Sequence, residues 1–136
     1  MSHLHDISQH EIGRLRIYMT RGDSVPAAGW KKFFGTPLFR HLVNLAQKDG
    51  ILHATTHSTP YGFAQGKNVS EQHPEYSKKC AVLYVELTAE RQQLEEFVKA
   101  HGELLQDKEM TYKHMERWKL ASASQSLRQI SVPAEL

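Results

Sequence analysis

The sequence predicts an α+β protein with a ferredoxin-like βαββαβ sandwich, in which a four-stranded antiparallel sheet carries two helices on one face. Three observations predict this class. Residues 14–20 and 109–120 alternate between apolar and polar side chains, as half-buried strands do. Residues 51–58 and 80–87 are rich in apolar and β-branched residues, which favours two further strands. Two segments between these runs repeat apolar residues every three or four positions, as amphipathic helices do.

The first half of the chain supplies a strand, a helix and a second strand. In "RLRIYMT" three apolar side chains share one face of the predicted strand: Leu15, Ile17 and Met19. The first helix is expected to begin with Thr36 as its N-cap and Pro37 as its first residue. It should end at Gly50, which accepts a left-handed backbone conformation. "ILHATTHS" then forms the second strand.

The second half repeats this order with "CAVLYVEL" as the third strand. Thr88 is the expected N-cap of the second helix, and Glu90 is placed to interact with the positive end of its dipole. An apolar stripe runs along this helix: Leu94, Phe97, Val98 and His101. Gly102 is expected to stop it. "EMTYKHMERWKL" is the last strand, and it alternates again.

Length and composition indicate a single domain with ordinary charge. The 136 residues carry a formal net charge of +2, spread along the chain, so they give no electrostatic case for nucleic acid or a membrane surface as a partner. We expect a flexible N-terminal segment over residues 1–12, one domain over 13–120 and a polar tail over 121–136. A single cysteine and the lack of a signal-like N-terminus favour a cytoplasmic protein.

One face of the expected sheet lacks helices and carries aromatic side chains. Tyr18 and Tyr84 should lie there, and Tyr112 and Trp118 are further candidates. Because an exposed aromatic face is usually covered, we expect a second subunit to pack near it.

Four stretches of the chain, read in order, resemble one family. These are "LRIYM", "GTPLFRHLVNLAQKDGILHATT", "YGFA" and "AVLYVELT", and the likeness extends over about residues 13–119. Together they resemble the PII-like proteins, homotrimers that sense small molecules in clefts between subunits, and within them the branch classified as domain of unknown function 190. The resemblance implies a homotrimer, an adenine nucleotide as the ligand, and a membrane transporter or an enzyme as the partner protein.

The same resemblance points to a ligand-responsive loop over residues 57–79. In nucleotide-binding PII proteins a Gly-Phe-Gly turn closes the second strand and opens the long T-loop. Tyr61, Gly62 and Phe63 stand at that position here, with Ala64 in place of the second glycine and Lys67 shortly after. Long loops inside compact domains are usually functional or disordered. The alternative is therefore a solvated loop without a ligand.

Two other groups of residues are candidate anion contacts. Gly35 and Thr36 precede the expected first helix, where backbone amides and the helix dipole favour an anion, although ordinary capping by Thr36 explains them equally well. Arg117 and Lys119 share one face of the last strand with Lys113. Arg14 and Arg16 lie on the neighbouring first strand. This basic face suits a phosphate, and a solvated rim or intersubunit ion pairs are the alternatives.

The histidines raise the question of a metal site. His53 and His57 face the same side of one strand but lie about 13 Å apart, too far to share a metal without a partner subunit. No established metal-binding spacing occurs in the sequence. A metal-binding trimer that resembles the copper-tolerance proteins of the same fold is therefore the second hypothesis. A ligand-free oligomerisation module is the third.

No catalytic signature of paired carboxylates or a nucleophile with its base stands out, and no cofactor beyond the nucleotide is implied. The sequence therefore indicates a binding protein rather than an enzyme.

Overall fold

The computed structural model describes residues 4–25, 35–63, 66, 69–71 and 81–122, and it has the predicted order of elements with three additions. The additions are the short strands β3 and β4 and the short helix α3. The elements are β1 (His5–Thr20), α1 (Leu38–Lys48), β2 (His53–Ser58), β3 (Tyr61–Gly62), β4 (Ser70–Glu71), β5 (Val82–Ala89), α2 (Arg91–Ala100), α3 (Gly102–Leu105) and β6 (Glu109–Ser122).

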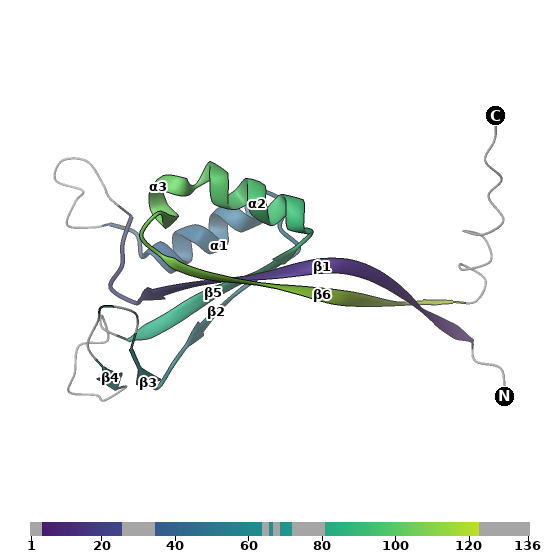
Figure 1. Ribbon diagram of the computed structural model, residues 1–136, viewed down its shortest axis with the longest axis horizontal. Coiled ribbons are helices and arrows are strands. Elements are labelled where there is room, and N and C mark those ends of the chain that lie inside the picture. The colour runs from purple at the N-terminus through teal and green to yellow at the C-terminus, as the bar shows by residue number, and fades with distance from the viewer. Residues whose placement is uncertain (1–3, 26–34, 64–65, 67–68, 72–80, 123–136) are drawn as a thin grey trace.

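The main sheet has the order β2-β5-β1-β6, and every neighbouring pair of strands is antiparallel. Figure 1 shows α1, α2 and α3 together on one side of this sheet. The predicted ferredoxin-like sandwich is therefore confirmed. Within the described ranges, no helix has the length and apolar character needed to cross a membrane.

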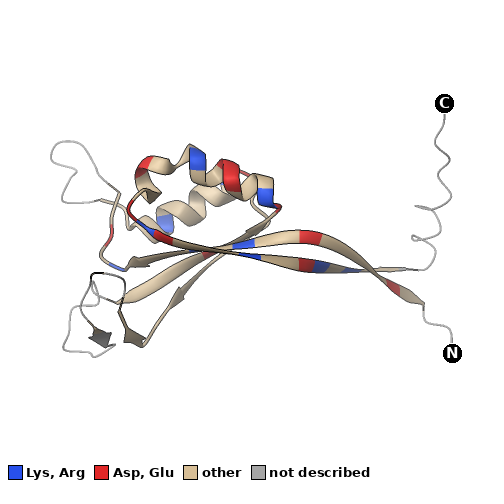
Figure 2. Cartoon of the chain, viewed as in Figure 1, with Lys and Arg blue, Asp and Glu red and all other residues tan. Residues whose placement is uncertain are grey.

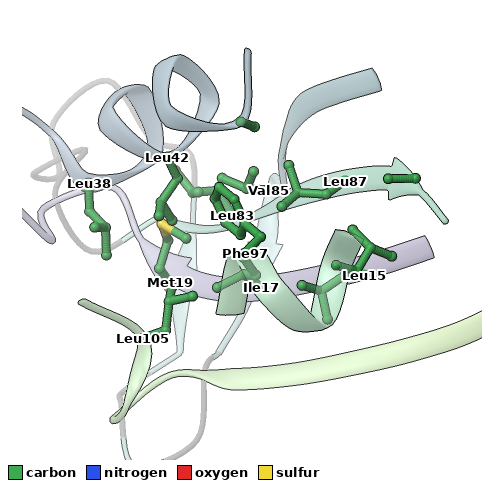
Figure 3. Close-up of a cluster of buried hydrophobic side chains, with 13 residues drawn as sticks. Leu15, Ile17, Met19, Leu38, Leu42, Leu83, Val85, Leu87, Phe97 and Leu105 are labelled. Atoms are coloured by element: carbon green, nitrogen blue, oxygen red, sulfur yellow. The ribbon is translucent and has the colours of Figure 1, made fainter. Parts of the chain in front are cut away.

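The core lies between the sheet and the helices, and the alternation of the strands decides which side chains enter it (Figure 3). Every second residue of β1 from Leu15 to Met19 is buried, and β5 behaves in the same way from Leu83 to Ala89. The helices contribute a buried set from their inner faces: Leu38, Leu42, Ala46, Leu94, Phe97 and Leu105. No polar or charged residue among those described is buried, so the core is held by apolar packing.

Both predicted helix starts are wrong by a short distance. Thr36 does not cap α1, which begins at Leu38 and has no side-chain capping bond. The Thr36 carbonyl instead accepts a hydrogen bond from the Val25 amide at 2.9 Å, and the Leu38 amide donates to the Asp23 carbonyl at 2.8 Å. Backbone groups from the segment after β1 thus hold the start of α1 in place.

The start of α2 is displaced for a different reason. Thr88 is still part of β5, where it pairs with Arg14 of β1. The helix therefore begins only at Arg91, and Glu90 occupies the N-cap position without a side-chain cap bond. Continued strand pairing has overridden the local capping preference of Thr88.

Gly102 does not stop the second helix as predicted. The break falls at His101, whose φ of −112° leaves the helical range, and Gly102 begins α3. The His101 ring packs edge-on against Phe97 at 4.6 Å and contacts the Asp49 carboxylate at 2.9 Å. His101 therefore links the C-terminal ends of α1 and α2.

The first and last strands extend beyond the expected domain limits. Residues 5–12 of β1 pair with residues 115–122 of β6 and form a two-stranded ribbon that projects beyond the helices (Figure 1). The expectation of a flexible segment is wrong for residues 5–12, and the expected boundaries at 12 and 120 both fall inside paired strands. Because the ribbon projects beyond the helices, packing against them does not select apolar residues along it. Residues 123–136 of the expected tail lie outside the described residues.

Candidate functional site

A groove lies at the end of the sheet where β1 finishes and β6 begins, opposite the ribbon. It has a volume of about 800 Å³. Its walls come from the end of β1, the turn before β6 and the base of the loop between β2 and β5. The lining residues are Tyr18, Met19, Thr20, Asp23, Phe63, Val82, Gln106, Asp107, Lys108, Glu109 and Thr111.

The polar centre of the groove is an ion pair between Asp23 and Lys108. The Lys108 Nζ lies 3.2 Å from one carboxylate oxygen of Asp23, and only 14% of the lysine side chain is exposed. The backbone amide and the hydroxyl of Thr20 each donate to the same carboxylate at 3.1 Å. Partial burial works to raise the pKa of Asp23, but the Thr20 hydrogen bonds and the Lys108 charge outweigh it and hold the pKa below its ordinary value.

Phe63 brings an exposed aromatic ring to the groove, as the sequence analysis placed it at the loop base. Its surface is 67% exposed, and that of Tyr61 is 66% exposed. Tyr61 and Gly62 form β3, which pairs with β4 and makes a short hairpin inside the loop. Thr59 fixes the start of this segment, because its amide and its hydroxyl both donate to the Val82 carbonyl at 2.9 Å. Lys67 lies outside the described residues.

Gly35 and Thr36 lie close to the segment after β1 but do not line the groove. A β-carbon at Gly35 would lie 2.9 Å from the Val25 carbonyl oxygen, so the backbone leaves no room for a side chain. Thr36 is exposed, and its backbone takes part in the bridge between this segment and the start of α1. Close packing therefore accounts for a glycine at position 35 without a ligand.

The basic residues predicted on the first and last strands share one face of the sheet, but the apolar pair of Ile12 and Met115 interrupts them. In the register of β1 and β6, Arg14 lies opposite Lys113, His10 opposite Arg117 and Ser8 opposite Lys119. We call Lys113, Arg117 and Lys119 the basic row. Figure 2 shows basic bands among acidic ones along the two strands β1 and β6. Arg117 and Lys119 lie on the ribbon, away from the groove, so one chain does not bring them near Phe63.

Glu86 forms ion pairs with the other two cations of this face, and its single charge offsets one of their two. Its Oε1 lies 3.2 Å from the Nε of Arg14 and 3.1 Å from the Nε of Arg16. The hydrogen bond to Glu86 is the main cause of a raised pKa for Arg16. The alternative of ion pairing thus applies to Arg14 and Arg16 within a single chain. No cation of the basic row has a carboxylate partner among the described residues.

His53 and His57 lie on the helix-free face of β2, in register with Thr88 and Tyr84. The His57 ring stacks on Tyr84 at 5.0 Å, and its Nε2 lies 2.8 Å from the Thr55 hydroxyl and 3.5 Å from Glu86. Across the part of the chain that the structure describes, no three side chains of histidine, cysteine, aspartate or glutamate gather as metal ligands would. The metal hypothesis therefore still requires a second copy of the chain.

The expected aromatic face is only partly correct. Tyr18 and Tyr84 lie together on the helix-free face, with their ring centroids 5.4 Å apart. Tyr112 instead lies opposite Leu15 on the helix side, where the Arg91 guanidinium stands 5.3 Å from its ring centroid. Trp118 follows the same alternation as Tyr112. The reason is register, because position 112 pairs with a core residue of β1.

Sequence patterns alone missed the Asp23–Lys108 pair. Asp23 follows Thr20 by three positions, which is a local signal for a turn with side-chain bonds. Lys108 lies 85 positions further along the chain. Only the meeting of β1 and β6 in the sheet brings the two together.

With the sheet order and the groove established, the class of protein is defined. The chain belongs to the family DUF190, described as "Uncharacterized ACR, COG1993", whose family model matches residues 12–117. None of the curated proteins matches this chain.

Two solved structures share the fold. One is CPII, a nitrogen regulatory PII-like protein from Thiomonas intermedia K12, bound to ADP, AMP and bicarbonate. It has a TM-score of 0.51 and 10% identity over 82% of this chain and 91% of that one. The other is TTHA0516 from Thermus thermophilus, described as a PII-like signaling protein, with a TM-score of 0.50, 9% identity and the same two coverages. At these identities the likeness shows a PII-like fold alone.

Proposed function

We propose that this chain is a PII-like regulatory protein that binds an adenine nucleotide in clefts between the copies of a homotrimer. The 57–79 loop changes conformation when the ligand binds, and a partner protein, either a membrane transporter or an enzyme, recognises that change. No reaction is catalysed.

The groove beside Phe63 is the observation that carries this proposal. Its volume of about 800 Å³ falls within the range of small-molecule sites. The exposed ring of Phe63 offers a surface on which a nucleobase can stack, which is worth about 1–3 kcal/mol per base. The nucleotides bound to CPII, which shares the fold, support an adenine nucleotide as the class of ligand.

The charges of the groove support a site shared between two copies. Its described lining holds three carboxylates, Asp23, Asp107 and Glu109, but only one ammonium group, Lys108. Lys108 is already engaged with Asp23 and Asp107. Nucleotide phosphates need cations, and Arg117 and Lys119 of the same chain lie at the far end of β6. A second copy can supply them, whereas the groove supplies the base-stacking surface.

The 57–79 loop is the expected signalling element because its base takes part in the groove. Phe63 follows β3 directly, so a ligand that contacts its ring also acts on the β3–β4 hairpin. The ligand shifts the population of loop conformations by its difference in affinity for them. A partner protein that recognises one conformation then responds to the nucleotide.

Isothermal titration calorimetry against ATP, ADP, AMP and cyclic AMP tests the proposal. We expect at least one of these to bind the wild-type oligomer, and we expect the Phe63→Ala variant to bind it about tenfold more weakly or worse. The Arg117→Ala/Lys119→Ala variant should also lose affinity. Lys48→Ala is the matched control, because it removes an exposed lysine at the end of α1, outside both groups.

Mixing the two variants tests whether the site lies between copies. If Phe63 and the basic row meet across an interface, oligomers assembled from equal amounts of both defective chains regain intact sites, about a quarter of the total for random mixing. A folded oligomer that binds none of the four nucleotides overturns the proposed function. Binding without recovery in the mixture places the whole site in one chain and overturns the shared cleft.

A further inference from the structure

The ribbon carries an apolar patch on the helix side of the sheet. Ile7, Trp118 and Leu120 are 53%, 64% and 69% exposed, and Ile7 lies directly opposite Leu120 in the strand register. The indole N–H of Trp118 donates to the Glu116 carboxylate. The polar tip of the tryptophan is therefore satisfied, and the rest of its ring remains in water. Exposed apolar groups that lie side by side in this way mark an interaction surface.

A small apolar pocket lies on the same side of β6, nearer to the helices. It has a volume of about 330 Å³ and lies between α2 and the strands β1 and β6. Its floor is formed by Leu15, Met110 and Tyr112, and Leu94 and Val98 form its wall. Arg91, Lys99 and Glu95 surround its mouth. Since Arg91 is paired with Glu95 at 2.9 Å, Lys99 gives this mouth a net positive charge.

The outer edge of β6 is the third feature. In the described sheet β6 pairs only with β1, so its other edge presents backbone donors and acceptors along its whole length. Such an edge is a template for pairing with another strand. The patch and the pocket both border this edge, and Trp118 and Tyr112 lie three positions on either side of Met115.

We propose that two copies of the chain pair antiparallel along the outer edges of β6, around a two-fold axis at Met115, so that Trp118 of each copy enters the pocket of the other. This register places Trp118 opposite Tyr112, Leu120 opposite Met110 and Glu116 opposite His114. Directly opposed residues of antiparallel strands share a face, so the apolar pairs fall on the helix side, where the pocket is open.

Neighbouring registers are less favourable. If the axis lies between two residues instead of at one, each residue on the helix side of one strand lies opposite a residue on the helix-free side of the other. Apolar side chains then face polar ones. An axis at His114 places Glu116 against Tyr112, and an axis at Glu116 places that carboxylate against its own copy. The chosen register has one kind of unfavourable contact, which opposes Lys113 of each copy to Arg117 of the other on the helix-free face and so occurs twice.

Disulfide trapping tests the register in the full-length chain with Cys80 replaced by serine. In the proposed pairing, Met115 faces Met115 of the other copy at a Cα separation of about 4.5–5.5 Å, which is within disulfide range. Met115→Cys should therefore form a covalent dimer under mild oxidation. Thr111→Cys is the matched control, because two such residues would lie about 25 Å apart on the same face. Equal trapping at both positions, or none at Met115→Cys, overturns the proposal.

Native mass spectrometry of Trp118→Ser tests the role of the patch. Trp118 lies outside the buried cluster, so the substitution should leave the fold intact while it weakens self-association through β6 at least tenfold. This contact does not depend on the proposed trimer. If both exist, the wild type is a hexamer and Trp118→Ser a trimer. If the trimer fails, the wild type is a dimer and the variant a monomer. An unchanged assembly in the variant contradicts the β6 contact alone.

Discussion

Asp23 connects the end of β1, the start of α1 and the turn before β6. Its carboxylate accepts hydrogen bonds from Thr20 at the end of β1, its backbone carbonyl holds the first amide of α1, and its side chain pairs with Lys108 before β6. The groove wall therefore depends on a charge that is only partly shielded from water. A salt bridge in such a setting contributes modestly to stability, and its hydrogen bonds add to it.

The pKa of Asp23 gives this contribution a definite pH dependence. Because the folded-state pKa lies below the ordinary value of 3.8, the stabilisation is present above that value and is lost as the pH falls through the folded-state pKa. We expect Asp23→Asn to lower the free energy of unfolding by about 1–2 kcal/mol at pH 7, and the difference from wild type should vanish in strong acid. Urea unfolding at a series of pH values measures it.

Asp107→Asn is the matched control for this measurement. Asp107 also contacts Lys108, at 3.4 Å, but 72% of its side chain is exposed. Its loss should change the free energy of unfolding by less than about 0.5 kcal/mol. A difference between wild type and Asp23→Asn that stays constant from pH 7 into strong acid contradicts the role given to the Asp23 charge.

At the scale of elements, periodicity predicted the strands and helices better than local signals predicted their ends. The alternation around Ile17 and the leucine repeat around Leu42 reflect which side chains are buried. Both side chains are 0% exposed in the structure. Thr36 does not cap its helix because its backbone takes part in a bridge to the segment after β1. Thr88 does not cap its helix because it is still paired within the sheet. Pairing partners far along the chain decide such ends, and a local motif carries no information about them.

Two glycines test how well a local signal predicts the end of a helix. Both were expected to end helices, but only Gly50 has a positive φ, of 77°, whereas Gly102 begins α3 and has open space around it. Gly50→Ala should destabilise the protein by about 1 kcal/mol because alanine is strained in that conformation. Gly102→Ala should be neutral or stabilise it by up to about 1 kcal/mol. Thermal and urea unfolding of both variants measure this, and equal effects would be the contrary result.

For the whole molecule, the sheet order followed from the sequence, but the candidate site did so only in part. Phe63 lies in the groove, whereas Arg117 and Lys119 lie along the ribbon at the other end of the sheet. A pattern along one chain predicts which faces are apolar or basic. It carries no information about which face of another copy lies against them, and the proposed nucleotide site depends on that contact for its cations.

A ligand that binds between copies must also hold those copies together. By thermodynamic linkage, the factor by which assembly raises nucleotide affinity equals the factor by which the nucleotide strengthens assembly. We therefore expect ADP to lower the concentration at which the proposed trimer dissociates, and we expect ADP affinity to fall when the protein is diluted below that concentration. Sedimentation of Trp118→Ser with and without ADP isolates this interface from the β6 contact.

The Phe63→Ala substitution added to that background should abolish the ADP effect, because the base-stacking surface is gone, while it leaves the ligand-free assembly unchanged. Equal ADP affinity for the dissociated chain and for the assembly would place the nucleotide in the groove of a single copy.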